Sequence, residues 1–128
     1  MTYVLDASAL VKMALEQTGT AAFRDWYVLH AAEPKVAPQL LWSEVGRALQ
    51  KDLRRADASV LAETHRRLLA GIDLRPVAES LAWRHAHNLT FYDAQYVALA
   101  ETEEATLVTC DRKMAAAATS AGVQTLLL

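Results

Sequence analysis

Two aspartates stand where a predicted strand passes into a predicted helix. Asp6 comes directly after the short apolar run 2–5, and Asp111 comes just after the run 105–109. In open parallel sheets, ligands bind outside the carboxyl ends of the strands, so both carboxylates are placed where chemistry usually occurs. An aspartate at such a junction is also a common helix N-cap. The local pattern leaves both roles open.

Two further acids lie on helix faces that should turn toward a core. Glu44 shares one side of its predicted helix with Leu41 and Val45, and Asp93 lies on the stripe that Tyr96 continues. A buried carboxylate without a partner is costly, so it must become protonated, accept a hydrogen bond or bind a cation. These two positions therefore need an explanation beyond packing.

The four acids have too few nearby cations to pair with. Arg47 is the only close basic residue on the helix of Glu44, and Asp93 has none on its own helix. Asp93 has a second possible role in a capping box, because Thr90 precedes it by three residues. Converging carboxylates would repel one another, and Mg²⁺ or Mn²⁺ takes oxygen ligands of this kind. The sequence therefore predicts a divalent-cation site.

Short strands and helices alternate along the chain. We expect strands at 2–5, 35–37, 72–75, 105–109 and 123–127, and helices at 8–15, 21–30, 38–53, 58–69, 78–87, 91–103 and 112–121. Pro38 would open the third helix, Gly122 would end the last, and a turn from Gln17 would separate the first two. This order predicts an α/β sandwich around a mostly parallel sheet, in one domain spanning residues 1–128.

Composition excludes several classes of protein. The 128 residues are 53% hydrophobic and 22% charged, which is globular rather than disordered composition. A net charge of −2 gives no general attraction to nucleic acid or anionic membranes, and no stretch is apolar enough to span a bilayer. The single cysteine, Cys110, cannot form an intrachain disulfide. With no signal peptide, we expect a cytoplasmic protein.

Four stretches, in order, carry a resemblance to a known family. They are YVLDASALVK with Asp6, PQLLWSEVGRAL with Glu44, LTFYDAQYVALAE with Asp93 and LVTCDRKMAAAA with Asp111. Together they resemble the PIN-domain nucleases, most closely the VapC toxins of toxin–antitoxin pairs.

The resemblance implies a fold, an activity and partners. The fold would be a three-layer α/β/α sandwich with a central parallel sheet. Asp6, Glu44, Asp93 and Asp111 would be the catalytic, metal-binding acids of a Mg²⁺- or Mn²⁺-dependent nuclease that cleaves single-stranded RNA. A homodimer and a VapB-like antitoxin partner are implied as well. Where some relatives have further acids after the last one, this chain has Arg112 and Lys113, so one or two metals remain possible.

Four smaller or basic residues near the acids are candidates for supporting roles. Ser8 and Thr109 match the family pattern and could hold a carboxylate or a metal-bound water. Lys12 lies one helical turn beyond Ser8, and Arg112 follows the last acid, so both could contact phosphates of the substrate.

Several alternatives stay open. A PIN-domain RNA-processing nuclease without an antitoxin, and an inactive metal- or RNA-binding module, would carry the same acids. A haloacid-dehalogenase-type phosphatase would need an aspartate at position 8, which is a serine here. The basic clusters at 51–55 and 65–67 are expected to be solvated helix faces, with RNA or antitoxin contact as the alternative. We expect the three tryptophans to lie in the core, and His85 and His87 to stabilise a helix end.

Overall fold

A computed structural model describes residues 1–15 and 20–128, so the turn predicted from Gln17 lies outside the described residues. The strands are β1 (Tyr3–Leu5), β2 (Lys35–Pro38), β3 (Ile72–Arg75), β4 (Thr106–Thr109) and β5 (Thr125–Leu127). The helices are α1 (Ala7–Ala14), α2 (Thr20–Leu29), α3 (Leu40–Asp52), α4 (Ala58–Leu69), α5 (Glu79–Arg84), α6 (Phe91–Thr102) and α7 (Arg112–Ser120). The predicted alternation of strands and helices is confirmed.

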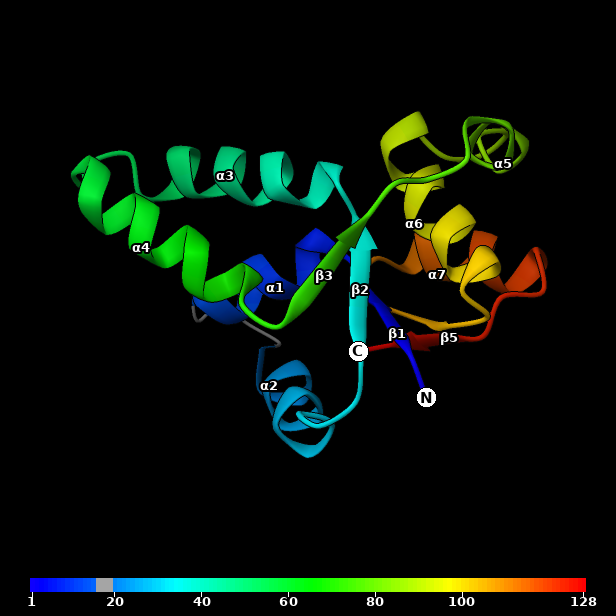
Figure 1. Ribbon diagram of the computed structural model, residues 1–128, viewed down its shortest axis with the longest axis horizontal. Helices are drawn as coiled ribbons and strands as arrows, with labels where there is room; N and C mark the ends of the chain where they lie inside the picture. Colours follow the sequence, from blue (N-terminus) through cyan, green and yellow to red (C-terminus); the bar gives the residue numbers. More distant parts are fainter. Residues whose placement is uncertain (16–19) are drawn as a thin grey trace.

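The strands form one parallel sheet between two layers of helices. Within the described residues the order is β3-β2-β1-β4-β5, and every neighbouring pair is parallel. Helices α5, α6 and α7 lie to one side of the sheet, and α1, α3 and α4 lie to the other (Figure 1). The predicted α/β/α sandwich is confirmed. Because all strands run the same way, their carboxyl ends share one edge.

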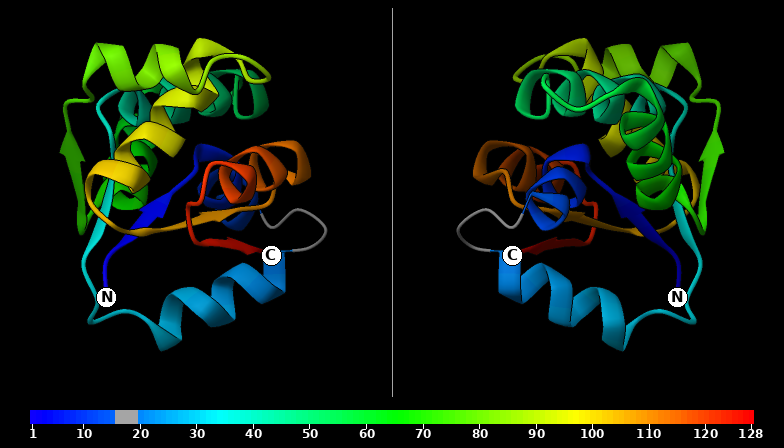
Figure 2. Two further views of the ribbon diagram at one scale, coloured as in Figure 1. Left: turned by 90° about the vertical axis from the view of Figure 1, so that its right-hand side faces the viewer. Right: turned by 90° about the vertical axis from the view of Figure 1, so that its left-hand side faces the viewer.

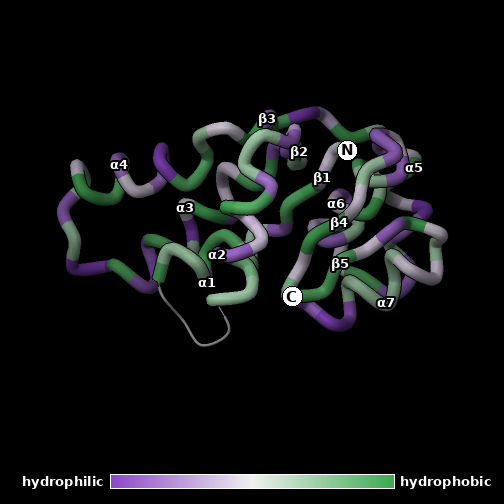
Figure 3. The backbone as a smooth tube through the Cα atoms, turned by 90° about the horizontal axis from the view of Figure 1, so that it is seen from below, coloured by the Kyte–Doolittle hydropathy of each residue, from purple (hydrophilic) through white to green (hydrophobic). Residues whose placement is uncertain are grey.

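The core is built around the central strand and the helix that crosses it. Val4 and Leu5 of β1 are fully buried, and α6 packs on β1, β2 and β4. Hydrophobic and hydrophilic stretches alternate along α4, which lies further from this core (Figure 3). Strands buried on both faces are expected to be apolar throughout. Burial on both faces holds β1 firmly, and with it the residue that follows it.

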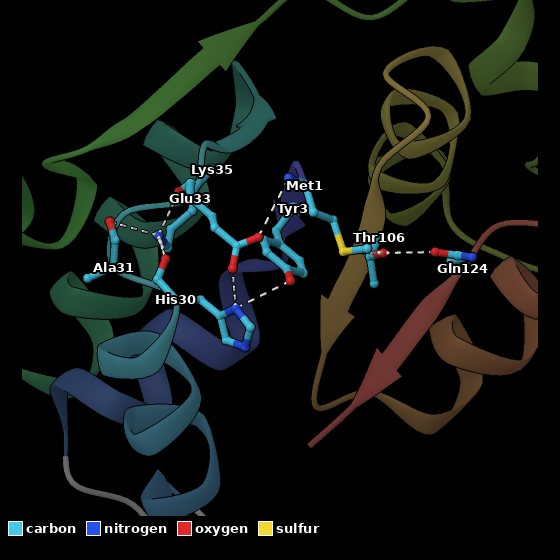
Figure 4. A network of polar contacts seen from close by, with 8 residues as sticks. All are labelled: Met1, Tyr3, His30, Ala31, Glu33, Lys35, Thr106 and Gln124. Atoms are coloured by element: carbon cyan, nitrogen blue, oxygen red, sulfur yellow. Dashed lines mark hydrogen bonds and ion pairs between the residues drawn. The ribbon is translucent and has the colours of Figure 1, made fainter.

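The opposite edge of the sheet, at the amino ends of the strands, contains a buried cation. Lys35 is 5% exposed, and its Nζ donates to the carbonyl oxygens of His30 (2.6 Å) and Glu33 (2.9 Å). His30 Nδ1 also lies 2.6 Å from Glu33 Oε1, and Tyr3 adds a contact (Figure 4). These bonds satisfy the ammonium inside the protein and tie the end of α2 to β2. Helix α2 lies at this edge, below the sheet in Figure 2.

Two element boundaries differ from the sequence prediction, and a third agrees with it. Pro38 does not open a helix: it ends β2 and pairs with Arg75, beyond the residues that β2 pairs with β1. Helix α5 ends at Arg84 because the His85 N–H bonds back to the carbonyls of Leu81 and Ala82 and tightens the last turn. Gly122, at φ +81°, follows the C-cap of α7 as predicted.

Among the described residues, no helix has the length and apolar character needed to cross a membrane.

Candidate active site

The four predicted acids all lie near the carboxyl edge of the sheet. Asp6 follows β1, and Asp111 follows the neighbouring strand β4. Glu44 lies in the second turn of α3, which begins after β2, and Asp93 lies in the first turn of α6. The negative charges of Asp6, Asp93 and Asp111 each raise the pKa of another acid of the group. The fold therefore gathers four carboxylates that the sequence spreads over more than a hundred residues.

Asp6 is the most deeply buried of the four acids. It is 5% exposed, and its Oδ2 accepts hydrogen bonds from the hydroxyls of Ser8 (2.6 Å) and Thr109 (2.8 Å). Although it occupies the N-cap position of α1, its side chain makes no capping hydrogen bond. Burial raises its pKa, the two hydroxyls oppose that rise, and the charge of Asp111 adds to it. Within the described residues, hydroxyls rather than a cation hold the Asp6 carboxylate in place.

Thr109 joins the ends of the two central strands. Its side chain is fully buried; Oγ1 donates to Asp6 and accepts from the backbone N–H of Asp111 at 3.0 Å. One hydroxyl therefore sets the position of one acid and the backbone of another. The Ser8 hydroxyl also donates to Asp6, and so it helps to position that one acid.

Asp111 is a helix cap as well as a member of the acidic group. Its Oδ1 accepts from the backbone N–H groups of Lys113 (2.9 Å) and Met114 (3.3 Å) at the start of α7. The N-cap role that the sequence left open is thus present at Asp111 and absent at Asp6. Since Oδ1 takes both capping bonds, Oδ2 lies outside the cap.

Glu44 has a partner that sequence analysis missed. The hydroxyl of Tyr96, a fully buried side chain of α6, donates to Glu44 Oε1 at 2.6 Å. Burial raises the pKa of Glu44; the Tyr96 bond opposes this, and the charges of Asp6 and Asp93 add to it. The signal was present, because a tyrosine on a buried stripe needs a partner for its hydroxyl. Its position three residues after Asp93 pointed toward the acids.

Asp93 is half-buried, and its environment favours the neutral form. Burial raises its pKa first, and the charges of Asp6 and Asp111 raise it further. Thr90 is the N-cap of α6 and accepts from the Asp93 N–H at 3.1 Å, so half of the predicted capping box is present. That bond uses the backbone of Asp93. The Thr90 side chain and the charge of Lys113 lower the pKa of the Asp93 carboxyl, but less than burial and the neighbouring acids raise it.

The acidic group fits a divalent cation in donor type and charge. Three of its members have pKa values raised by burial and by one another's charge, which is the repulsion that a bound cation would relieve. Carboxylate oxygens are the ligands that Mg²⁺ and Mn²⁺ prefer. In the described part of the chain, however, no three His, Cys, Asp or Glu side chains lie close enough together to surround one ion. The fit is one of chemistry rather than of a closed coordination shell.

The predicted basic residues Lys12 and Arg112 lie on α1 and α7, outside the acidic group. Lys12 of α1 is near the Cys110 thiol: burial raises the pKa of Cys110, and the charge of Lys12 opposes it. Arg112 is exposed at the start of α7. In the more distant clusters, Arg66 and Arg67 both pair with Glu63 on the surface of α4.

The tryptophans divide between core and surface. Trp26 is buried as expected, but Trp42 and Trp83 are 59% and 58% exposed, so the core prediction is wrong for both. Trp42 lies one residue off the buried stripe of α3, and Trp83 packs its ring on Phe91 with centroids 4.6 Å apart.

Replacing Thr109 by valine tests the link between the strand ends. Thr109→Val keeps the shape of the side chain but removes the donor to Asp6 and the acceptor for the Asp111 N–H. We expect a loss of about 2 kcal/mol in the free energy of unfolding, since buried polar groups lose their partner. Urea unfolding measures this, with Thr109→Ser as the control that keeps the hydroxyl. If valine is tolerated better than serine, the hydroxyl does not hold the site.

Comparison with known proteins places these features in context. The model of the PIN domain family matches residues 3–119. Ribonuclease VapC1 of Mycobacterium tuberculosis is 38% identical over 122 residues, covering 89% of each chain. Exonuclease VapC9 of Pyrobaculum aerophilum is 32% identical over 132 residues, covering 98% of this chain and 93% of its own.

Solved structures agree with the fold. The crystal structure of PAE2754 from Pyrobaculum aerophilum matches with a TM-score of 0.69 at 28% identity, over 98% of this chain and 83% of its own. VapBC2 of Rickettsia felis, solved bound to a DNA fragment from its promoter, matches with a TM-score of 0.73 at 12% identity. The match covers 99% of this chain and 98% of the other. At that identity the second likeness concerns the fold alone.

Proposed function

Because this chain belongs to the PIN domain family, we propose that it is a metal-dependent endoribonuclease that cleaves single-stranded RNA. The observation that carries the proposal is the group of four carboxylates, from four separate elements, at the carboxyl edge of the parallel sheet. The raised pKa values within that group support a cation rather than an internal salt bridge as its partner. The ribonuclease name of the M. tuberculosis relative supports the same substrate class.

The side chains divide the work of holding the site. Asp6, Glu44, Asp93 and Asp111 would hold Mg²⁺ or Mn²⁺, and Ser8, Thr109 and Tyr96 keep two of the four in place. Held there, the ion would supply a lower pKa for a bound water and stabilisation of negative charge on the phosphate and the departing 3′ oxygen. Lys12 and Arg112 would contact neighbouring phosphates of the RNA.

We further propose that the protein is the toxin of a VapBC-type pair. The relatives that carry the VapC name, and the fold shared with a VapBC complex, support a VapB-like antitoxin as partner. A homodimer acting in the cytoplasm belongs to this proposal. An antitoxin gene beside the coding sequence would support it, whereas a lone gene would favour an RNA-processing nuclease.

Cleavage of RNA with and without metal tests the proposal. We expect a pool of single-stranded RNAs to be cut in Mg²⁺ or Mn²⁺ and to remain intact in EDTA, a rate difference of about 10³-fold or more. Products should carry 5′-phosphate and 3′-hydroxyl ends. Including circular RNA separates two activities, because only an endonuclease opens a circle.

Other outcomes would each point elsewhere. Cleavage that survives EDTA would overturn the metal-dependent mechanism. Degradation of linear RNA with intact circles would favour an exonuclease, the activity in the name of the P. aerophilum relative. A folded protein that binds RNA but never cuts it would favour the inactive binding module.

A further inference from the structure

A groove of about 460 Å³ lies beside the acidic group, between the end of α5 and α7. One wall is the exposed side of α7, where Ala116 and Ala117 present only methyl groups. The other wall carries Arg84, His87 and Asn88, from the end of α5 and the segment that follows it. Both helices lie on the same side of the sheet (Figure 1). The groove thus has one flat wall and one wall of side chains that donate hydrogen bonds.

The charge of the groove is positive. None of the described residues that line it is acidic, and Lys113 at its end makes no ion pair or side-chain hydrogen bond within the described part of the chain. Behind this wall, Glu101 contacts two lining residues: its Oε1 lies 3.3 Å from Arg84 Nη1 and its Oε2 lies 2.5 Å from His85 Nε2. Within the described residues, the other guanidinium donors of the exposed Arg84 have no partner. A free ammonium, a guanidinium and a carboxamide are groups that proteins use to contact phosphate oxygens and sugars.

The groove begins where the acidic group ends. Lys113 is in the first turn of α7, and its backbone N–H donates to Oδ1 of Asp111. Its ammonium also lies close enough to Asp93 to oppose the rise in the pKa of that carboxyl. One turn of helix therefore carries both an acid of the site and the first cation of the groove.

We propose that this groove binds the single-stranded RNA chain next to the cleavage site, with Lys113 and Arg84 on phosphates. The proposal rests on the function proposed above and extends it, because a chain with one phosphodiester at the acids must continue across the surface. The groove offers it Arg84 on the wall at the end of α5 and Lys113 at the start of α7. Further along α7, the alanines leave room for riboses and bases.

Charge variants on the alanine wall test the proposal most directly. Ala116 is exposed in α7, so Ala116→Glu places a carboxylate in the groove without removing a packed side chain. Ala116→Gln is the uncharged control of equal size, and Lys113→Ala removes the cation while keeping the backbone cap of α7. Ala22→Glu, on the exposed surface of α2 at the opposite edge of the sheet, is the control for net charge, because it changes the total by the same single unit.

The measurement is the fluorescence anisotropy of a labelled, unstructured single-stranded RNA, with every variant in an Asp93→Asn background so that the RNA stays intact. We expect Ala116→Glu and Lys113→Ala each to weaken binding roughly fivefold at low salt, and Lys113→Ala to lower the salt slope by about 0.7. Ala116→Gln and Ala22→Glu should bind within about twofold of the parent. Circular dichroism of each variant checks that α7 is intact.

The outcomes separate the groove from the nuclease activity. If Ala116→Glu and Lys113→Ala bind RNA as Ala22→Glu does, the groove is not the RNA path, and an acidic protein segment becomes its better occupant. If the wild-type protein still cuts RNA, the proposed nuclease activity would hold despite that result. If the variants weaken binding but the wild type never cuts, the groove stands and the proposed nuclease activity fails.

Discussion

Asp93→Asn is expected to lower the rate of RNA cleavage by about 10²-fold or more. A metal supplies several kcal/mol of transition-state stabilisation, and each 1.4 kcal/mol that is lost lowers the rate about tenfold. The same variant should fold at least as stably as the wild type. This combination is unusual, since most losses of activity in a small protein accompany a loss of structure.

The reason lies in what the Asp93 side chain does for the fold. The bond that caps α6 runs from the Asp93 backbone N–H to the Thr90 hydroxyl, and asparagine keeps that N–H. Burial and the charges of Asp6 and Asp111 raise the pKa of Asp93, so its negative charge opposes folding in the absence of a cation. Replacing the carboxylate by an amide relieves that cost. The substitution should therefore lower the cleavage rate without lowering the stability of the fold.

The experiment compares cleavage rates and thermal unfolding for Asp93→Asn and a matched control. Asp25→Asn makes the same chemical change on the exposed surface of α2, at the other edge of the sheet. It should cut RNA like the wild type. An Asp93→Asn protein that cuts at the wild-type rate would show that Asp93 is a capping residue only. An unfolded variant would contradict the account of its side chain.

The placement of the acids could be predicted because it follows from the direction of the strands. Asp6 and Asp111 each follow a strand, and parallel strands bring such residues to one edge. The stripe containing Glu44 predicted that this acid faces inward. These inferences needed only local patterns and the parallel sheet, and both are strong in this chain.

The bonds that each acid makes could not be predicted in the same way. Asp6 and Asp111 have similar local sequences, yet only Asp111 caps its helix. Asp6 differs because the hydroxyl of Thr109, 103 residues away in the chain, donates to it. The Tyr96–Glu44 bond likewise spans 52 residues. Such contacts depend on which helices pack together, and the periodicity of one helix does not contain that information.

Errors at Pro38 and Trp42 have a different origin. Proline is favoured in the first turn of a helix, but at the end of β2 it pairs with β3 alone, beyond the part of β2 that pairs with β1. Trp42 is apolar, and so the core is its usual place, but it lies beside the buried stripe of α3 rather than on it. For Trp42 the helical pattern indicated an exposed position, but the prediction followed the apolar residue type instead.

Metal-free protein is expected to become less stable as the pH rises above about 5, the reverse of the usual trend for paired carboxylates. Asp6, Glu44 and Asp93 all have raised pKa values, with burial as the main cause and neighbouring acids as a further one. A carboxyl with a pKa raised by folding holds its proton longer in the folded state. Stability is therefore lost as the pH rises from the unfolded-state pKa, near 4, through the folded value.

The range above pH 5 isolates these groups from others that titrate in the opposite direction. Glu33 and Asp57 have lowered pKa values, Glu33 chiefly through its bond with His30 and Asp57 through Ser59. Their contribution is present above the unfolded-state pKa and disappears in acid, below about pH 4. Thermal unfolding in EDTA at several pH values measures the net trend. A melting temperature that rises steadily toward neutral pH would contradict the raised values.

Adding Mg²⁺ or Mn²⁺ should reverse the loss. A cation that binds only the folded state stabilises it by about 2.7 kcal/mol at a hundred times its dissociation constant, or roughly 10 °C in a domain of this length. The gain should be large at pH 7.5 and small at pH 5, where protons compete for the same oxygens. Asp93→Asn should respond less than Asp25→Asn, and K⁺ at equal ionic strength should have little effect. Since this readout involves no RNA, an equal response from both variants would remove Asp93 from the metal site, whatever its effect on cleavage.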